Sequence, residues 1–231
     1  MTQKTAIVTG ASGAIAAPII DAFAKAGWKL ALVARSQTGV ERLKNSRPDQ
    51  LVLQADLADD AQARRAVSEA REGLGHIDAL LNIAGGFDMS AAADTSPEQL
   101  DAQMAINFHT AFNASRAVLA TMLERGEGFI LGIGAAAAFD GGGQVGAYAA
   151  SKAALTVWMK SMAAEVAPRG LCVSMLHPMG AVDTPSNREA MPDSDPQSWV
   201  DPAEIAATAL HLATRGRRGQ VPEAKVYPPA A

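Results

Sequence analysis

Short apolar runs alternate with longer amphipathic stretches along the whole chain. The apolar runs are about as long as β-strands, and they read TAIVTG, KLALVA, QLVLQA, IDALLNIAG, GFILGIG and LCVSML. Runs that are almost continuously apolar are typical of strands buried on both faces of a parallel sheet. A seventh, weaker strand is predicted at Ala224–Tyr227.

Helical patterns separate these runs. Helices are predicted at Ala14–Ala26, Asp60–Glu72, Pro97–Leu123 and Val145–Val166. The alternation predicts a single α/β domain over residues 1–231, with a doubly wound, mostly parallel sheet of about seven strands and helices on both faces. Residues 186–200 form one irregular insertion, rich in Pro and Asp, and a further helix is expected to begin at Asp201-Pro202.

The composition indicates one compact domain of the size that buries a real core: 231 residues, 48% hydrophobic and 19% charged. The net charge is -4 with both signs interspersed, so a nucleic-acid partner is not expected. No apolar run reaches membrane-spanning length. Cys172 is the only cysteine, and with no secretory signal pattern this favours a cytoplasmic protein. The four histidines are scattered, so no metal site is expected.

A glycine-rich stretch, TGASGAIA, follows the first apolar run and opens the first helix. Gly10 allows a tight turn, and Gly13 lets backbone amides approach a pyrophosphate at the helix N-terminus. Many strand-to-helix turns need glycine for backbone reasons alone. The position in the first strand–helix unit nevertheless favours nucleotide binding, with Ser12 and Ile15 in the same site.

The end of the second run indicates which nucleotide binds. An acidic residue there would bind the adenosine ribose hydroxyls of NAD, but the chain reads LVARS, with Ala34 in the acidic position. Arg35 and Ser36 suit a 2′-phosphate through charge-assisted hydrogen bonds. An ordinary exposed arginine is the alternative. We therefore predict that NADP(H) is preferred and that NAD(H) is possible.

Polar or small residues end two further runs. Asp56, followed by Leu57, can accept a hydrogen bond from an adenine amino group, or it can cap the next helix. Asn82, Ala84 and Gly85 would let the backbone pass beneath the cofactor ribose, although a plain strand-ending turn is the alternative.

Tyr148 and Lys152 are four residues apart, so on a helix they share one face. A lysine ammonium beside a phenol is expected to lower the tyrosine pKa from about 10 and to tune the phenol for proton transfer. Lys152 can also hold the nicotinamide ribose. The alternative is a surface tyrosine with a solvated lysine. Ala135 stands thirteen residues before the tyrosine, where a serine hydroxyl would usually complete such a site.

In their order along the chain, these motifs resemble the short-chain dehydrogenase/reductase family. The matching residues are Thr9, Gly10, Gly13, Asp56, Asn82, Ala84, Gly85, Asn107, Tyr148, Lys152 and the segment from Pro178 through Val182 to Thr184. The resemblance implies a Rossmann fold, a nicotinamide cofactor and hydride transfer with Tyr148 as proton donor or acceptor. It also implies that Asn107 holds a water in the proton relay. A homodimer or homotetramer through the 97–123 and 145–166 helices is implied too.

Three segments are similar to the quinonoid dihydropteridine reductases, a branch that lacks the serine: IAGGF, AAAAFDGGGQVGAY and DTPSNREAMPDSDPQSW. In that branch a conjugated acceptor can be reduced with the tyrosine proton alone. The resemblance implies that residues 185–200 form a lid over a small-molecule substrate, with Ala135, Met191 and Trp199 as candidate contacts. A plain surface connection is the alternative.

Those reductases usually carry an acid after the second strand and prefer NADH, whereas this chain has Ala34 and Arg35. A general aldehyde or ketone reductase and a non-catalytic sensor of NADP(H) remain as alternatives.

Overall fold

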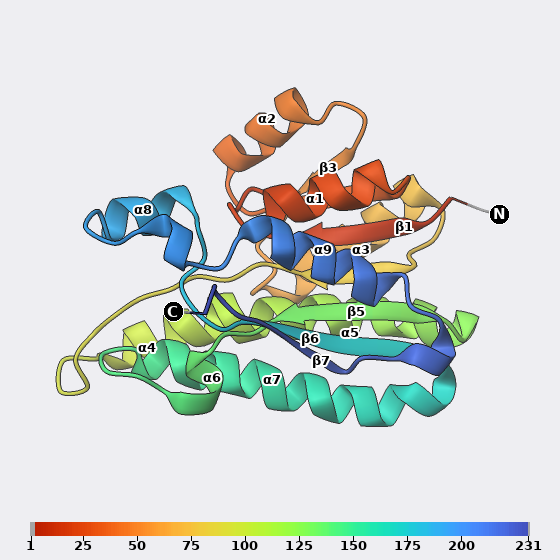
Figure 1. The fold of residues 1–231 in the computed structure, drawn as a ribbon. Coiled ribbons are helices and arrows are strands. Elements are labelled where there is room, and N and C mark those ends of the chain that lie inside the picture. Colours follow the sequence, from red (N-terminus) through yellow and green to blue (C-terminus); the bar gives the residue numbers. More distant parts are fainter. Residues whose placement is uncertain (1–2, 231) are drawn as a thin grey trace.

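Seven parallel strands form one sheet in the computed structural model, which describes residues 3–230 (Figure 1). The strands are β1 (Thr5–Thr9), β2 (Lys29–Ala34), β3 (Leu51–Gln54), β4 (Ala79–Asn82), β5 (Gly128–Ile133), β6 (Leu171–Pro178) and β7 (Glu223–Val226). Their order across the sheet is β3-β2-β1-β4-β5-β6-β7, and every neighbouring pair is parallel. This confirms the predicted fold class, including the weak last strand.

Helices cover both faces of the sheet (Figure 1). They are α1 (Ala16–Lys25), α2 (Gln37–Ser46), α3 (Asp60–Leu74), α4 (Pro97–Met104), α5 (Thr110–Arg125), α6 (Ala137–Asp140), α7 (Gly146–Val166), α8 (Pro185–Ala190) and α9 (Pro202–Ala213). Buried residues of α1, α2 and α9 share one core, and those of α3, α5 and α7 share the other. Successive strand residues alternate between the cores, so Ala6 and Val8 face one and Ile7 faces the other.

The helix predicted at 97–123 is not continuous, which corrects the prediction. Between α4 and α5 the residues Ala105–His109 form a π-helix. In this segment Asn107 is fully buried, and the Thr110 amide donates to the carbonyl of Ala105. Wider turns of this kind often occur at functional sites. Hydrophobic periodicity could not reveal the interruption, because the apolar pattern runs through it.

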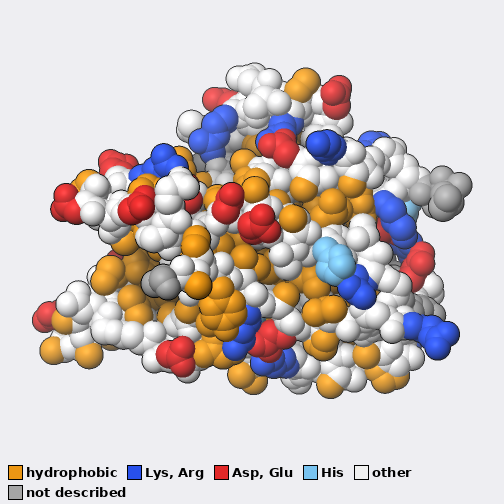
Figure 2. Space-filling view, in the orientation of Figure 1, with side chains coloured by type: hydrophobic (Ala, Val, Ile, Leu, Met, Phe, Trp, Pro, Cys, Tyr) orange, Lys and Arg blue, Asp and Glu red, His pale blue; other side chains and the backbone are white. Residues whose placement is uncertain are grey.

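The segment 183–200 leaves the body of the protein and returns to it. Val182 and Val200 pair as an isolated parallel bridge, and the Asp183 amide donates to the Val200 carbonyl at 2.9 Å. Between these points α8 stands beyond the ends of the strands (Figure 1). Hydrophobic side chains line the recess between this projection and the rest of the molecule (Figure 2). Within residues 3–230, we find no helix both long and apolar enough to cross a membrane.

Candidate functional site

The glycine-rich turn after β1 lies against the end of β4. Gly10 has a φ of +60°, and a Cβ atom there would lie 2.6 Å from the Cα atom of Ala84. Beneath the turn, the Thr9 hydroxyl accepts hydrogen bonds from the amides of Ile83 at 3.0 Å and Ala84 at 3.1 Å. The sequence interpretation assigned no role to Thr9, although it is the first residue of the motif. The ends of β1 and β4 therefore meet at the topological switch point, where open α/β sheets bind their ligands.

The start of α2 packs on the same turn. Ser36 is the N-cap of α2, and its hydroxyl oxygen accepts the Gly39 amide at 3.1 Å. Arg35 precedes it and is exposed. Ser12, in the turn, is half-buried, and its Oγ would lie 3.0 Å from a Cβ atom at Gly39. The residues predicted to hold the adenosine end are thus neighbours, although they lie in two separate segments.

The turn after β3 is also closed by local hydrogen bonds. Asp56 Oδ1 accepts from the amide of Ala58 at 3.0 Å, whereas Asp59 is the cap of α3 and accepts from Gln62 at 2.9 Å. Asp56 was considered either as an acceptor for an adenine amino group or as a helix cap. Asp59, not Asp56, is the cap of α3. Asn113 of α5, which the sequence interpretation missed, donates to the carbonyl of Leu57 at 3.0 Å and holds this turn in place.

Tyr148 and Lys152 lie on the first turns of α7. Lys152 is buried, and its Nζ atom donates to the carbonyl oxygen of Ile133, at the end of β5, at 3.0 Å. The same Nζ atom is 6.0 Å from the centroid of the Tyr148 ring. Phe87 meets Tyr148 edge-on, with the ring centroids 4.9 Å apart. The phenol and the ammonium are therefore close to each other, beside an exposed aromatic ring that was missed from the sequence.

The pKa of Tyr148 differs from the value expected from the sequence. Burial raises the pKa of Tyr148 to about 12, and burial also lowers the pKa of Lys152 to about 8. The ammonium was expected to lower the tyrosine pKa, but its hydrogen bond goes to Ile133, and burial of the phenol raises the tyrosine pKa instead. The phenol consequently stays protonated at neutral pH.

Asn107 joins the loop after β4 to α7. Its Oδ1 accepts the Gly86 amide at 3.0 Å, and its Nδ2 donates to the Gly86 carbonyl at 3.0 Å. The same Nδ2 lies 3.1 Å from Gln103 Oε1 and 3.1 Å from Ser151 Oγ. Ser151 in turn donates to the carbonyl of Tyr148 at 2.7 Å. The side chain of Asn107 is thus committed to protein groups, and its role in holding a water stays a prediction.

Ala135 follows β5 and is buried. The backbone on either side is fixed to β6, because the Gly134 amide donates to Leu176 at 2.8 Å and the Ala136 amide to Pro178 at 3.1 Å. On β4, Asn82 is buried and donates to Ser115 Oγ at 3.0 Å.

The base of the projecting segment has a structural role. Thr184 caps α8 by accepting the Asn187 amide at 3.2 Å, and Val182 is buried beside it. Trp199 is also buried, whereas Met191 is only half-buried. Of the two candidate substrate contacts in this segment, Met191 is the more accessible.

The residues present fit a nicotinamide dinucleotide. Gly13 is exposed at the N-terminal end of α1, where backbone amides favour a pyrophosphate. At Gly85 a Cβ atom would lie 2.9 Å from Asn107 Oδ1 and 3.2 Å from Lys152 Nζ, so a side chain there would occupy the space beside the lysine. Bare backbone therefore lines the crevice from the glycine-rich turn to Lys152.

Comparison with known proteins agrees with this geometry. A family model described as short chain dehydrogenase matches residues 4–195. The oxidoreductase UcpA of Salmonella typhimurium is 34% identical and covers 93% of this chain and 89% of its own length. An uncharacterized oxidoreductase of Staphylococcus saprophyticus is 29% identical over 99% of this chain and 98% of its own.

Solved structures of similar fold span almost the whole chain. The 3-ketoacyl-(acyl-carrier-protein) reductase from Brucella melitensis, complexed with NADH, has a TM-score of 0.86 and 25% identity, covering 97% of this chain and 96% of that one. A short-chain dehydrogenase from Streptomyces avermitilis has a TM-score of 0.85 and 24% identity, covering 97% and 88% respectively. At this identity the second likeness concerns the fold alone.

Proposed function

Because the chain belongs to the short-chain dehydrogenase family, we propose that it reduces a quinonoid, imine-like or carbonyl small molecule with NAD(P)H, with Tyr148 as the proton donor. The observation that carries the proposal is a half-buried, protonated phenol next to a buried ammonium. A protein that only bound the cofactor would have no need of this phenol.

The chain's own residues move the proton. A bound dihydronicotinamide supplies a hydride to the acceptor and is itself oxidised. The Tyr148 O–H bond breaks and its proton passes to a nitrogen or oxygen atom of the acceptor, which completes the two-electron reduction. The phenolate left behind is stabilised by the Lys152 ammonium until a proton returns from solvent. Asn107 keeps the loop of Gly86 in position beside the pair.

Ala135 supports the choice of acceptor. Without a hydroxyl at this position, a simple carbonyl loses one hydrogen-bond donor, which costs about 10²–10³ in rate where a site depends on it. A conjugated ring system spreads the developing charge, so a single proton donor suffices. Phe87, which is 60% exposed and edge-on to Tyr148, provides an aromatic side chain against which a flat ring can pack. This supports a dihydropteridine reductase-like activity. A general aldehyde or ketone reductase is the second candidate, supported by the likeness to the ketoacyl reductase structure.

We propose NADPH as the preferred cofactor, since Arg35 and Ser36 stand where an acid would select NADH.

The bound substrate would lie beneath residues 185–200. This segment would close over the substrate from its base, where Val182 pairs with Val200. We also propose a homodimer or homotetramer through α5 and α7. In support, Trp158 of α7 contacts Phe112 of α5 and Phe108 of the preceding π-helix, and Val157, the residue before Trp158, is 67% exposed.

The test follows the loss of NADPH absorbance at neutral pH for the wild type and for Tyr148→Phe. The acceptors are quinonoid dihydropterin, a set of quinones and a set of ketones. We expect the wild type to turn over and the variant to lose a factor of about 10²–10⁴ while still binding NADPH. Tyr227→Phe is the matched control, because Tyr227 is the only other tyrosine and is 64% exposed. Tight NADPH binding with no turnover of any acceptor would instead indicate a sensor.

A further inference from the structure

Gln144 has a backbone conformation that glutamine rarely adopts. Its φ is +63°, and among the residues that the structure describes it is the only one other than glycine with a positive φ. Gly141 and Gly142, in the same loop, have φ of +68° and +145°. Glycine adopts such angles without strain, whereas a residue with a side chain does not. Strain of this kind is concentrated at functional sites, so the presence of glutamine at this position needs an explanation.

The loop of Gln144 is joined to the loop that follows β4. The Gln144 carbonyl oxygen accepts the Ser90 amide at 2.8 Å. Phe87, in the loop after β4, meets the Tyr148 ring edge-on, and Gln144 is four residues before Tyr148 in the chain. Gln144 and Phe87 are both exposed. Two loops that are distant in the sequence therefore meet beside the proposed proton donor, and each contributes an exposed side chain.

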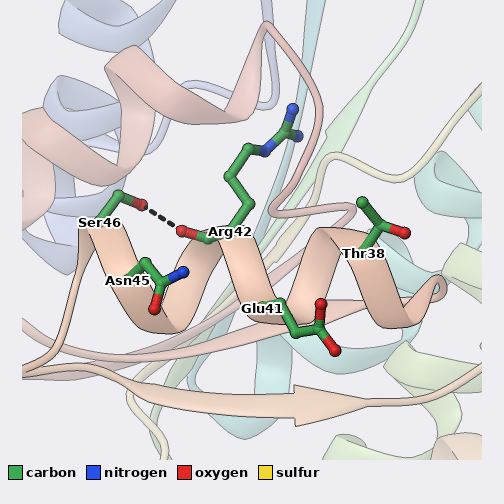
Figure 3. Close-up of a pocket in the computed structure, with 5 residues that line it drawn as sticks. All are labelled: Thr38, Glu41, Arg42, Asn45 and Ser46. Carbon is green, nitrogen blue, oxygen red and sulfur yellow. Dashed lines mark hydrogen bonds between the residues drawn. The ribbon is translucent and has the colours of Figure 1, made fainter.

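The protein itself does not use the Gln144 side chain. On α2, by contrast, the Ser46 hydroxyl donates to the Arg42 carbonyl at 2.8 Å (Figure 3), and the Arg42 side chain donates to the Ser12 carbonyl. The side-chain amides of Asn45 and Gln144 form no hydrogen bond with any described residue. Asn45 lies within a helix on unstrained backbone, but Gln144 does not. Contacts within the described chain therefore do not explain why glutamine is present at the strained position.

We propose that Gln144 is a specificity-determining residue whose side-chain amide binds the cyclic-amide edge of a flat, conjugated acceptor. This inference rests on the proposed function and narrows the acceptor to a ring that carries an N–H group next to a carbonyl oxygen or a ring nitrogen. A primary amide presents a donor and an acceptor side by side, so it matches such an edge with two hydrogen bonds. Phe87 packs against the ring while Tyr148 donates to the reacting atom. A quinone or a simple ketone offers acceptors only, so it leaves the amide oxygen of Gln144 without a donor.

The experiment measures binding without turnover. Pterin and naphthoquinone are flat bicyclic rings of similar size, and only pterin has N–H groups next to acceptor atoms. Binding of each is measured by calorimetry with NADP⁺ present, and again with NAD⁺ present, for the wild type and for Gln144→Leu. We expect Gln144→Leu to weaken pterin binding about 10- to 100-fold and to leave naphthoquinone binding within about twofold.

Two further variants separate the amide from the backbone strain. Gln144→Asn keeps an amide, and asparagine tolerates a positive φ, so part of the pterin binding should return. Gln144→Gly removes the amide and relaxes the backbone, so its thermal transition should rise while its pterin binding falls as in Gln144→Leu. Asn45→Leu removes an exposed amide from α2 and is the matched control, which should change neither ligand. Phe87→Ala should weaken both ligands, because packing against a ring does not depend on its edge.

A purely structural role for Gln144 predicts a different result. If Gln144 only shapes the loop, both ligands weaken equally in Gln144→Leu, and the inference is wrong. It is equally wrong if Gln144→Leu, folded by its thermal transition, binds both ligands as the wild type does, or if the wild type binds pterin no more tightly than naphthoquinone. NADPH oxidation by quinones or ketones, with pterin binding that does not depend on Gln144, would refute this inference and leave the reductase standing. No turnover with any acceptor, alongside pterin binding that depends on Gln144, would refute the proposed reductase and leave this inference standing.

Discussion

Lys152 Nζ donates to the carbonyl oxygen of Ile133 across 3.0 Å, which joins α7 to the end of β5. The lysine is only 5% exposed, and this burial lowers the pKa of its ammonium to about 8. The positive charge of Lys152, which we propose stabilises a Tyr148 phenolate, is thus present at neutral pH and is lost in the mildly alkaline range.

The rate of reduction should therefore depend on pH through Lys152. We expect kcat/KM to fall as the pH rises through about 8, because the ammonium is lost while Tyr148, with a pKa of about 12, remains protonated. Lys152→Met should lower the rate about 10²–10⁴-fold and abolish this alkaline limb. Steady-state rates measured between about pH 6 and pH 10 provide the test. Lys160→Met, on the exposed side of the same helix, is the control; an alkaline limb that persists in Lys152→Met would contradict the assignment.

The same substitution should change the pH dependence of stability. Because the pKa of Lys152 is lowered from 10.5 to about 8, the unfolded chain binds a proton between these values that the folded chain does not. Wild-type stability should therefore rise with pH across this interval, and the contribution is lost as the pH falls through about 8. Urea unfolding of Lys152→Met should lack this rise.

Asn107→Ala should destabilise the fold as well as the site. The substitution leaves the Gly86 amide without its acceptor and removes a donor from Gln103 and Ser151. A buried polar group left unpaired costs on the order of 1–3 kcal/mol, so the free energy of unfolding should fall by at least that amount. Chemical denaturation measures the loss. Asn45→Ala, on the exposed surface of α2, should change stability by less than about 0.5 kcal/mol.

His177 should make the protein sensitive to mild acid. Its ring is fully buried against Gly134, where a Cβ atom would lie 2.0 Å from Nδ1, and its Nε2 atom is 3.9 Å from Glu223. Burial lowers the pKa of the ring to about 4 from 6.5, and the nearby Glu223 opposes this only in part.

Between these values the unfolded chain binds a proton that the folded chain does not, so stability is lost as the pH falls from 6.5 to about 4. The single group accounts for up to about 3 kcal/mol of this loss. Unfolding of His177→Leu should show a shallower decline over the same interval. His109→Gln, at an exposed ring, should follow the wild type; parallel curves for all three proteins would show that His177 is not responsible.

Ala135→Ser should change which acceptor is reduced. The added hydroxyl restores a donor for simple carbonyl groups, so kcat/KM for ketones should rise by up to about 10²-fold. Reduction of a quinonoid acceptor should change little, because its charge is already spread over the ring. The ratio of the two rates is the measurement, with Ala136→Ser, at the next position, as the control. A ketone rate that does not rise would show that Ala135 does not determine the substrate class.

Val157→Glu should weaken the proposed assembly. The side chain is 67% exposed beside the aromatic cluster of α5 and α7, and a carboxylate there cannot be buried between subunits without a partner. Sedimentation velocity should detect an oligomer in the wild type and a shift toward monomer in the variant. Ala190→Glu, on the exposed surface of α8, should sediment as the wild type. Identical sedimentation of all three would place the interface elsewhere or exclude it.

The sequence by itself determined the architecture and the edge of the sheet at which the candidate site residues lie. The alternation of strand-length apolar runs with helical patterns is a local signal. The start of α9 is another, because Asp201 caps the helix by accepting the Ala203 amide. Tyr148 and Lys152 come together because residues four apart share a helix face. None of this requires knowledge of residues distant in the chain.

Only the tertiary structure decided how these residues behave. Three features depend on which of several possible partners is close in the folded chain, or on groups far apart in sequence. They are the π-helix at Asn107, the cap at Asp59 and the contact of Arg42 with Ser12. The pKa of Tyr148 rises because packing removes water from the phenol. Burial and contacts between distant segments exist only in the packed chain. The hydrophobic pattern could therefore predict which elements carry these residues, but not their pKa values or their hydrogen-bond partners.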